Sequence, residues 1–289
     1  MQRLGIDIGG SSVKVCLIDN EKEIHTARSE NYRDLSRSEL VLKICEAVRL
    51  LPLTVNNNTK VGLCLPGKHA DDGQSIEHSV NLPCLNGWAF ELMLKDSLRC
   101  IPESFKVVSD VRAAGEDYLR SHASTGRTVI IAIGTGVGLS VFDGTSPISI
   151  GSGSIGHIGM IDVGKLDSTD RYAHDGARNT LESYIGAQAI QSRFPDVASI
   201  DIPSSIQKLK IDDPILIALV RAIRIVHAIY VPDRIVLMGG VGIALQPKRD
   251  KIDSTIRDGL TTLAKPNWML AFGDSIYHAA RGAAACSLG

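Results

Sequence analysis

The chain contains two copies of one local pattern, in which an apolar run enters a glycine-rich turn and a second apolar run leaves it. The first copy extends from Gly5 to Asp19 and turns at Gly9-Gly10-Ser11-Ser12. The second extends from Thr128 to Gly144 and turns within Gly134-Thr135-Gly136-Val137-Gly138. Short β-branched runs on both sides of a turn predict a β-hairpin in each copy. Two matching units in one chain indicate duplicated lobes that face one another across a cleft.

The rest of the chain alternates between strand and helix patterns. Apolar strands are expected at 60–67, 105–109 and 235–238, and helices at 36–51, 90–100, 111–121, 215–230 and 275–286. This alternation predicts layered α/β domains and argues against a helical bundle or a β-sandwich. In the helix that follows Pro214, one apolar face is opposed by Arg221, Arg224 and His227, which we interpret as a solvated face.

The first turn has the composition of a phosphate-binding loop. Gly9 and Gly10 permit positive φ angles and leave room for a ligand, and the N–H groups and hydroxyls of Ser11 and Ser12 form a concavity for anionic oxygens. Asp7, at the end of the preceding strand, is well placed to hold a hydrated Mg²⁺ on the phosphates of a nucleotide. Taken alone, the turn also fits an ordinary tight hairpin. A P-loop is excluded, because no Gly-Lys-Ser/Thr sequence opens a helix here.

The second turn supports the phosphate interpretation, although it differs at the metal position. Aligning the two turns places Ala132 opposite Asp7. The second copy is therefore expected to cradle phosphate without holding a metal in the same way.

Asp110 is the candidate catalytic residue. It follows the apolar strand Lys106-Val107-Val108 at the start of a helix, so it lies at the carboxyl edge of a sheet, where α/β proteins bind ligands. One positioned carboxylate suffices to accept the proton of a hydroxyl nucleophile. The alternative is a plain helix N-cap, and both roles can coexist on one carboxylate. The two phosphate turns lead us to favour the general base.

Composition excludes several classes of partner. The net charge is −1 and no basic cluster is present, which argues against nucleic acid. No run reaches the roughly 20 apolar residues of a membrane span, so no membrane partner is expected. The chain begins directly on its first strand, which predicts no cleavable signal. Six cysteines without a Cys-x-x-Cys pair are typical of reduced core residues in a cytoplasmic protein.

In this order, the motifs resemble those of the ROK family of bacterial sugar kinases (glucokinase- and fructokinase-like), within the two-lobed actin-like, ribonuclease H-like ATPase fold. The segments that carry the resemblance are both turns, Pro66-Gly67, Asn81-Leu82-Pro83 with Trp88, Ser109-Asp110 with Ala113-Ala114-Gly115-Glu116, Gly153-Ser154-Ile155-Gly156-His157, Leu181-Glu182 and 235–241. The resemblance implies a small lobe over 1–112, joined by a C-terminal helix at 274–289, and a large lobe over 113–273. It also implies ATP-dependent phosphorylation of a hexose or hexose derivative, with ATP and Mg²⁺, in a homodimer.

The resemblance further implies two sets of site residues. The nucleotide would be held by Asp7, Gly9, Gly10, Ser11, Ser12, Lys14, Gly134, Thr135, Gly136, Gly138, Gly239 and Gly240. The sugar hydroxyls would be held by Asn81, Ser109, Asp110, His157 and Glu182.

Two of these motifs depart from the family pattern. Ser109 stands where the family has Asn, and Ser154 stands where it has Glu. Loss of the carboxylate at 154 predicts weak binding of unmodified glucose. The smaller side chain leaves room for a bulkier substituent, such as an N-acetyl group, or for a water molecule.

The structural zinc site of the family is expected to be lost. Its Cys-x-Cys-Gly…Cys-Leu-Glu pattern is replaced here by Ala173-His174-Asp175-Gly176…Thr180-Leu181-Glu182. Without thiolates, His157, His174 and Asp175 form only an incomplete ligand set. We therefore expect no structural zinc, and we expect charged side chains among Asp167, Asp170 and Arg171 to tether the loop.

A non-catalytic sugar-binding regulator or a scaffold of the same fold is the alternative function. Relatives that act as regulators place a DNA-binding module ahead of the first turn, whereas four residues precede Gly5 here. The retained Asp110 also favours the kinase.

Overall fold

The computed structural model describes residues 2–19, 23–52, 54–150, 155–197 and 202–287. The chain divides into two compact units, one formed by Met1–Asp117 with Tyr277–Gly289 and the other by Tyr118–Ile276. The boundaries predicted from the sequence lie after residues 112 and 273. The first division point falls inside one helix, α3 (Asp110–Ser121).

The first unit is built on a five-stranded mixed sheet with the order β3-β2-β1-β4-β7. Its strands are β1 (Arg3–Ile8), β2 (Val13–Asp19), β3 (Glu23–Arg28), β4 (Lys60–Cys64) and β7 (Ser104–Val108). β1 and β2 form the predicted hairpin, and β4 and β7 run parallel to β1. The carboxyl ends of β1, β4 and β7 therefore lie at one edge of the sheet. A small hairpin of β5 (Lys68–His69) and β6 (Ile76–His78) and the short helix η1 (Pro83–Leu85) follow β4.

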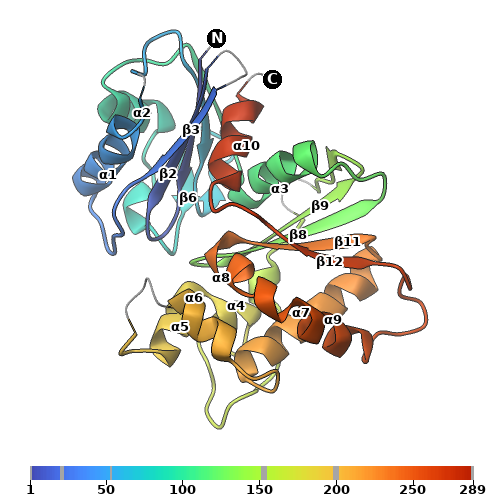
Figure 1. The fold of residues 1–289 in the computed structure, drawn as a ribbon. Coiled ribbons are helices and arrows are strands. Elements are labelled where there is room, and N and C mark those ends of the chain that lie inside the picture. Colours follow the sequence, from blue (N-terminus) through green and yellow to red (C-terminus); the bar gives the residue numbers. More distant parts are fainter. Residues whose placement is uncertain (1, 20–22, 53, 151–154, 198–201, 288–289) are drawn as a thin grey trace. The chain divides into compact units, whose positions relative to one another are not determined.

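Helices cover both faces of this sheet (Figure 1). On one face, α1 (Arg37–Arg49) and α2 (Phe90–Leu98) pack on the side chains of Leu4, Ile6 and Ile8. A capping box between Ser36 and Glu39 starts α1.

The opposite face holds α10 (His278–Cys286), which lies directly on the strands. A Cβ at Gly5 would overlap the carbonyl of Ala280, and one at Gly62 would overlap that of Ala283. Because side chains alternate along a strand, Asp7 lies on the same face as Gly5.

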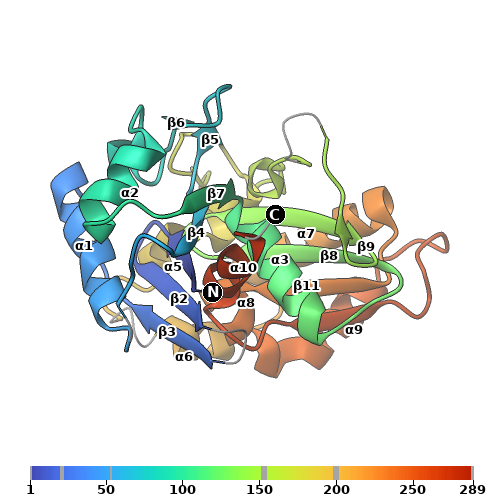
Figure 2. The same ribbon diagram turned by 90° about the horizontal axis from the view of Figure 1, so that it is seen from above.

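The second unit contains another five-stranded sheet, with the order β10-β9-β8-β11-β12. Figure 2 shows its strands β9, β8 and β11 side by side. Its strands are β8 (Arg127–Ile133), β9 (Val137–Asp143), β10 (Ser146–Pro147), β11 (Arg234–Met238) and β12 (Met269–Phe272). β8 and β9 form the second predicted hairpin, and β11 runs parallel to β8. The sequence analysis did not assign β12, an edge strand.

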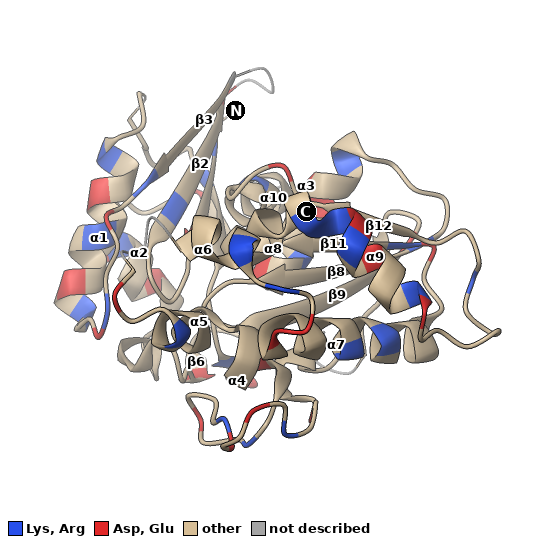
Figure 3. Cartoon of the chain, turned by 60° about the horizontal axis from the view of Figure 1, so that its bottom comes forward, with Lys and Arg blue, Asp and Glu red and all other residues tan. Residues whose placement is uncertain are grey.

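The helices of this unit are mostly short. They are α4 (Leu181–Ile185), α5 (Ala187–Arg193), α6 (Ile202–Lys208), α7 (Pro214–Tyr230), α8 (Gly239–Ala244) and α9 (Arg249–Arg257), with η2 (Ile158–Met160) and η3 (Gln246–Lys248). The predicted apolar face of α7 packs on alternate residues of β8 and β11. No helix in the described ranges has the length and apolar character needed to cross a bilayer. Along α1 and α9, basic and acidic side chains are interspersed (Figure 3).

The solvated face predicted for α7 is partly wrong. Arg221 is exposed, but it donates to the carbonyl of Val163, at 2.6 Å. Arg224 donates to the backbone carbonyls of Thr255 and Ile256, in the last turn of α9, and so does not simply extend into solvent. His227 is buried against Trp268. The reason is that 255–268 folds back over the helix, which the periodicity of α7 alone does not reveal.

Candidate functional site

The first glycine-rich turn closes tightly between β1 and β2. The N–H of Gly9 donates to the carbonyl of Ser12, at 3.1 Å. None of the four glycines at positions 9, 10, 134 and 136 adopts the left-handed backbone conformation. The predicted use of positive φ is therefore wrong, and the absence of side chains is what these glycines contribute. Ser12 is buried, whereas Ser11 is exposed.

Asp7 and Lys14 face each other across this hairpin. They are register partners on β1 and β2, and Lys14 Nζ lies 3.2 Å from Asp7 Oδ2. Asp7 is 6% exposed, so this ion pair is largely removed from water. In the second hairpin Ala132 pairs with Gly138 at the equivalent place, which confirms the predicted alignment and shows that both charges are missing there.

Tyr32 braces the first turn, and the sequence analysis did not identify it. Its hydroxyl donates to the carbonyl of Gly9 at 2.6 Å, and its N–H donates to the carbonyl of Ser11 at 2.9 Å. Burial, followed by the negative charge of Asp7, raises the pKa of Tyr32 above its ordinary value. The hydroxyl therefore remains a donor at neutral pH.

Asp110 is the first residue of α3, and only Ser109 separates it from β7, the last parallel strand of the first unit. The first hydrogen bond of the helix joins the N–H of Ala113 to the carbonyl of Ser109, so Ser109 occupies the N-cap position rather than Asp110. Asp110 Oδ1 accepts from the N–H of Val111 at 2.8 Å. The alternative of a plain N-cap at Asp110 is therefore not what the structure contains.

Asp7 and Asp110 lie at the same edge of the first sheet. Asp7 is aligned with Cys64 on β4, and Cys64 is aligned with Val108 on β7. Two strand spacings, about 10 Å, thus separate the backbone of Asp7 from the segment that leads into Asp110.

The surroundings of Asp110 favour its protonated form more than water does. The residue is exposed, and its carboxyl is nevertheless partly desolvated by the protein around it. This desolvation, followed by the negative charge of Asp7, raises its pKa, while the hydrogen bond from Val111 and the charge of Lys14 act in the opposite direction. A carboxylate with a raised pKa is a better proton acceptor than an ordinary one.

The predicted sugar-side residue Asn81 is half-buried in a loop of the first unit that is fixed at several points. The N–H of Ser79 donates to Asn86 Oδ1 at 2.7 Å. Arg37, at the start of α1, donates to the carbonyls of Cys84 and Asn86, at 2.9 and 2.6 Å. Its guanidinium also lies over the ring of Trp88. The sequence analysis did not identify Arg37 as a residue that holds this loop.

In the second unit, the turn at 134–136 is held by the segment that carries Glu182. Glu182 Oε2 accepts from the N–H of Val137 at 2.9 Å. The N–H of Ala187, the first residue of α5, donates to the carbonyl of Gly134, also at 2.9 Å. Both anchors come from α4 and α5, about 50 residues further along the chain than the turn.

Three glycines enclose the side chain of Glu182. A Cβ added at Gly136 would lie 2.7 Å from Glu182 Oε2, and one added at Gly159 would lie 2.9 Å from the same atom. A Cβ added at Gly186 would lie 3.1 Å from Glu182 Cγ. Gly136 is therefore required for close approach to Glu182. An added Cβ at Gly134 would have no neighbour within 4 Å, which is the open approach that a phosphate group needs.

The electrostatic surroundings of Glu182 connect it with the other predicted residues of this unit. Burial, followed by the negative charge of Asp175, raises the pKa of Glu182, against the hydrogen bond from Val137 and the charges of His174 and His157. His157 is exposed and directly precedes η2. Ser154 lies outside the described residues.

Gly239 and Gly240 begin α8 beside the second turn. Gly239 has a φ of 76°, and a Cβ there would overlap the carbonyl of Ile133, the residue before Gly134. An added Cβ at Gly240 would have no neighbour within 4 Å. Gly239 thus has a packing role, while Gly240 leaves room for a ligand.

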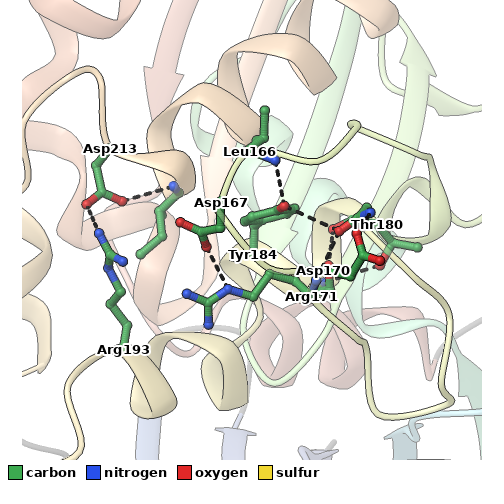
Figure 4. A network of polar contacts seen from close by, with 11 residues as sticks. Leu166, Asp167, Asp170, Arg171, Thr180, Tyr184, Arg193 and Asp213 are labelled. Atoms are coloured by element: carbon green, nitrogen blue, oxygen red, sulfur yellow. Dashed lines mark hydrogen bonds and ion pairs between the residues drawn. The ribbon is translucent and has the colours of Figure 1, made fainter.

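The loop between η2 and α4 is tethered by polar side chains (Figure 4). Arg171 Nε lies 2.6 Å from Asp167 Oδ2, and Arg178 lies 3.5 Å from Asp170. Asn179 donates to Asp170 at 2.9 Å. Charged side chains tether the loop, as predicted, although the position of Asn179 among them was not foreseen. The expectation that the loop holds no zinc stays a prediction.

The predicted residues therefore form two groups, each described within its own unit. The first unit holds the first turn with Asp7, Lys14, Ser109 and Asp110 at one sheet edge, and Asn81 on a separate braced loop. The second unit holds the second turn with Glu182, His157 and the start of α8.

Comparison with known proteins identifies the fold and the family. A family model described as the ROK family matches residues 3–286. A ROK family glucokinase from Streptomyces griseus, solved with glucose and AMPPNP, has a TM-score of 0.75 at 16% identity, with 99% of each chain covered. A putative N-acetylmannosamine kinase from Listeria monocytogenes has a TM-score of 0.71 at 12% identity, covering 100% of this chain and 99% of the other.

A ROK family transcriptional regulator, a homolog of the E. coli MLC protein, is also similar. Its TM-score is 0.68 at 17% identity, and 99% of this chain and 78% of the other are covered. No curated protein matches the sequence. These similarities confirm the predicted actin-like α/β fold, which hosts both kinases and regulators.

Proposed function

The chain belongs to the ROK family, and we propose on this premise that it is an ATP-dependent kinase of a hexose or hexose derivative. The observation that carries the proposal is Asp110, a carboxylate with a raised pKa at the sheet edge that also holds Asp7 and the first turn. A regulator could use the same carboxylate to accept a hydrogen bond from a sugar hydroxyl, but it would gain nothing from the raised pKa.

In the proposed reaction, Asp110 accepts the proton of a sugar hydroxyl while the hydroxyl oxygen attacks the γ-phosphorus of ATP. The bond between the γ-phosphorus and its bridging oxygen breaks, so that ADP leaves and a sugar phosphate forms. Asp110 Oδ1 is engaged by Val111, which fixes the carboxylate and leaves the other oxygen to face the hydroxyl. Fixing this geometry in advance supplies much of the catalysis in such reactions.

The two turns would hold the phosphates of ATP. The open position of Gly134 admits close approach of a phosphate to backbone N–H groups. At the first turn, Ser11 is exposed and available as a donor, while Tyr32 engages the carbonyls of Gly9 and Ser11. The carbonyls of Gly9, Ser11 and Ser12 are thus occupied by protein donors, and the exposed hydroxyl of Ser11 would face the anion.

The residues around Asp7 fit an indirectly held Mg²⁺. Lys14 occupies one carboxylate oxygen of Asp7, so the other oxygen would accept from water molecules on the ion, which Mg²⁺ keeps readily. When bound, Mg²⁺ would neutralise charge on the phosphates. Asp7 would then position the hydrated ion, and Lys14 would hold the carboxylate of Asp7 in place.

The experiment that tests the proposal is an assay of ADP formation against a panel of hexoses and N-acetylhexosamines. We expect the preferred sugar to carry a larger substituent than glucose, because Ser154 stands where the family has the longer side chain of Glu. ADP release that depends on one sugar class, together with transfer of ³²P from [γ-³²P]ATP to that sugar, supports a kinase. Release that is absent with every sugar contradicts it.

The second candidate is a sugar-binding regulator without catalysis. It is favoured by the similarity to the ROK family transcriptional regulator. It is also favoured by Ser109, which stands next to Asp110 at the position where the family has Asn. Sugar binding measured by calorimetry, without any ADP release, would identify this function.

A further inference from the structure

Asn179 is a buried residue with an unusual backbone conformation, and it uses all of its polar groups. It is 8% exposed, and its φ of 53° lies in the left-handed region. Its N–H donates to the carbonyl of Arg171 at 2.7 Å, and its carbonyl accepts from Val163 at 3.0 Å. Asn is one of the few residues other than glycine that adopt this conformation readily.

The side chain of Asn179 connects three points of the loop. Nδ2 donates to Asp170 at 2.9 Å. Oδ1 accepts from the N–H of Arg171 at 3.0 Å and from the hydroxyl of Tyr184 at 3.4 Å. Tyr184 in turn accepts from the N–H of Leu166 at 2.8 Å (Figure 4). The side-chain amide of Asn179 therefore connects Asp170 and Arg171 of the 166–179 loop with Tyr184 of α4, which in turn binds Leu166 at the start of the loop.

Asn179 directly precedes the helix that carries Glu182. Thr180 is the N-cap of α4, and its hydroxyl accepts from the N–H of Ser183 at 3.2 Å. The N–H of Leu181 donates to the carbonyl of Ile161 at 3.0 Å. A continuous chain of contacts thus leads from the amide of Asn179 to α4 and, through the carboxylate of Glu182, to the N–H of Val137 at the second turn.

We propose that Asn179 is a positioning residue that sets the place of Glu182 against the second turn. The proposal rests on the proposed function in one respect, because it assigns to Glu182 and the turn a role in substrate binding. In this proposal the 166–179 loop also positions the residues that bind substrate. The loop fixes the start of α4, and α4 fixes the turn.

The test compares Asn179→Gly with Asp170→Ala and with the double variant. Glycine retains the left-handed conformation and removes only the side chain. Asp170→Ala removes the acceptor of Nδ2 and lies at the edge of the cluster, so it keeps the test informative if Asn179→Gly does not fold. Arg178→Ala is the matched control, because its exposed side chain makes only a 3.5 Å ion pair to the same Asp170.

The first readout is the hydrogen exchange rate of the Val137 amide, measured by NMR. We expect this rate to rise about tenfold in Asn179→Gly, the factor that corresponds to the loss of one buried hydrogen bond. The rates within α7 should stay at the wild-type level, since α7 belongs to the core of the unit. Because both single variants break one link of the same chain, their effects should not add in the double variant.

The second readout is steady-state kinetics with the sugar found in the panel. We expect KM for sugar and for ATP to rise severalfold in Asn179→Gly, with kcat reduced less, because the residue acts through Glu182 and not on the reacting atoms. Arg178→Ala should behave as wild type in both readouts. A Val137 rate unchanged in both Asn179→Gly and Asp170→Ala would overturn the proposal, and so would a rate that rises equally in Arg178→Ala.

The two readouts separate the two proposals. A wild-type protein without sugar-dependent ADP formation, in which Val137 still responds to Asn179→Gly, refutes the kinase and retains the positioning role. An active wild-type protein whose Val137 amide and KM values are insensitive to Asn179 retains the kinase and refutes the positioning role.

Discussion

We expect His227 to make the stability of the second unit depend on pH. The side chain is 2% exposed and lies edge-on to the indole of Trp268, with the ring centroids 4.3 Å apart. Neither ring nitrogen has a hydrogen-bond partner in the part of the chain that the structure describes. Burial, together with the positive charge of Arg257 and against the negative charge of Asp253, lowers the pKa of His227 from 6.5 to about 4.

The direction and size of the effect follow from these two values. The folded protein keeps His227 neutral, whereas the unfolded chain takes up a proton below a pH of about 6.5. The free energy of unfolding therefore falls as the pH is lowered from about 6.5 to about 4, and this contribution levels off below that. One pKa unit corresponds to about 1.4 kcal/mol, so the difference of about 2.5 units gives a loss of about 3 kcal/mol.

We expect His227→Leu to remove this part of the pH dependence. Leucine has a similar volume and leaves no unpaired nitrogen, so the variant should be as stable as wild type at pH 7, or more stable. The assay is urea unfolding at several pH values between 4 and 7, followed by tryptophan fluorescence. His78→Gln, at an exposed histidine, should keep the wild-type profile. A His227→Leu protein that loses as much free energy over this range as wild type would refute the reasoning.

Three further predictions concern the two turns and the loop. Gly134→Ala should fold and bind AMPPNP at least about tenfold more weakly, because the new methyl group occupies the space through which a phosphate would approach. Gly136→Ala should instead raise KM for both sugar and ATP, because its methyl group displaces Glu182. Calorimetry checks the first variant and kinetics the second, and wild-type AMPPNP affinity in Gly134→Ala would contradict a phosphate site at Gly134. Tyr32→Phe should raise KM for ATP severalfold with little change in kcat, since it removes the 2.6 Å hydrogen bond to the carbonyl of Gly9, and an unchanged KM counts against the brace. Protein purified without added metal should contain little zinc by elemental analysis and should keep its Tm in EDTA; near-stoichiometric zinc with a lower Tm in EDTA would show that the loop is held by metal.

The sequence predicts those features whose causes are local. Both hairpins form where a β-branched run meets a glycine-rich turn, and Asp110 begins a helix directly after a strand. The alignment of Ala132 with Asp7 also follows from the sequence alone, because the two-residue periodicity of a strand fixes which positions are equivalent.

The sequence does not predict features that depend on distant segments. Gly9 and Gly10 were expected to use positive φ angles, and they do not. Gly136 is needed for a different reason, because Glu182, far along the chain, packs against it. His227 has the spacing of a polar face on α7, but it is buried because Trp268 covers it. In the sequence, nothing distinguishes Asn179 from other polar loop residues. Only the structure shows that its backbone N–H and carbonyl and both polar atoms of its side chain form hydrogen bonds. Glu182 and Trp268 come from segments far along the chain, and the partners Asp170 and Arg171 of Asn179 lie in an irregular loop, so no local pattern identifies them.

The proposed function has its most direct test at Asp110. In Asp110→Asn, kcat of sugar-dependent ADP formation at saturating sugar and ATP should fall by about 10²-fold or more, because the amide cannot accept the proton of the hydroxyl. The affinity for AMPPNP, measured by calorimetry on the same preparation, should stay near that of wild type. A variant with wild-type kcat would contradict a general base at Asp110, and with it the observation on which the proposed kinase rests.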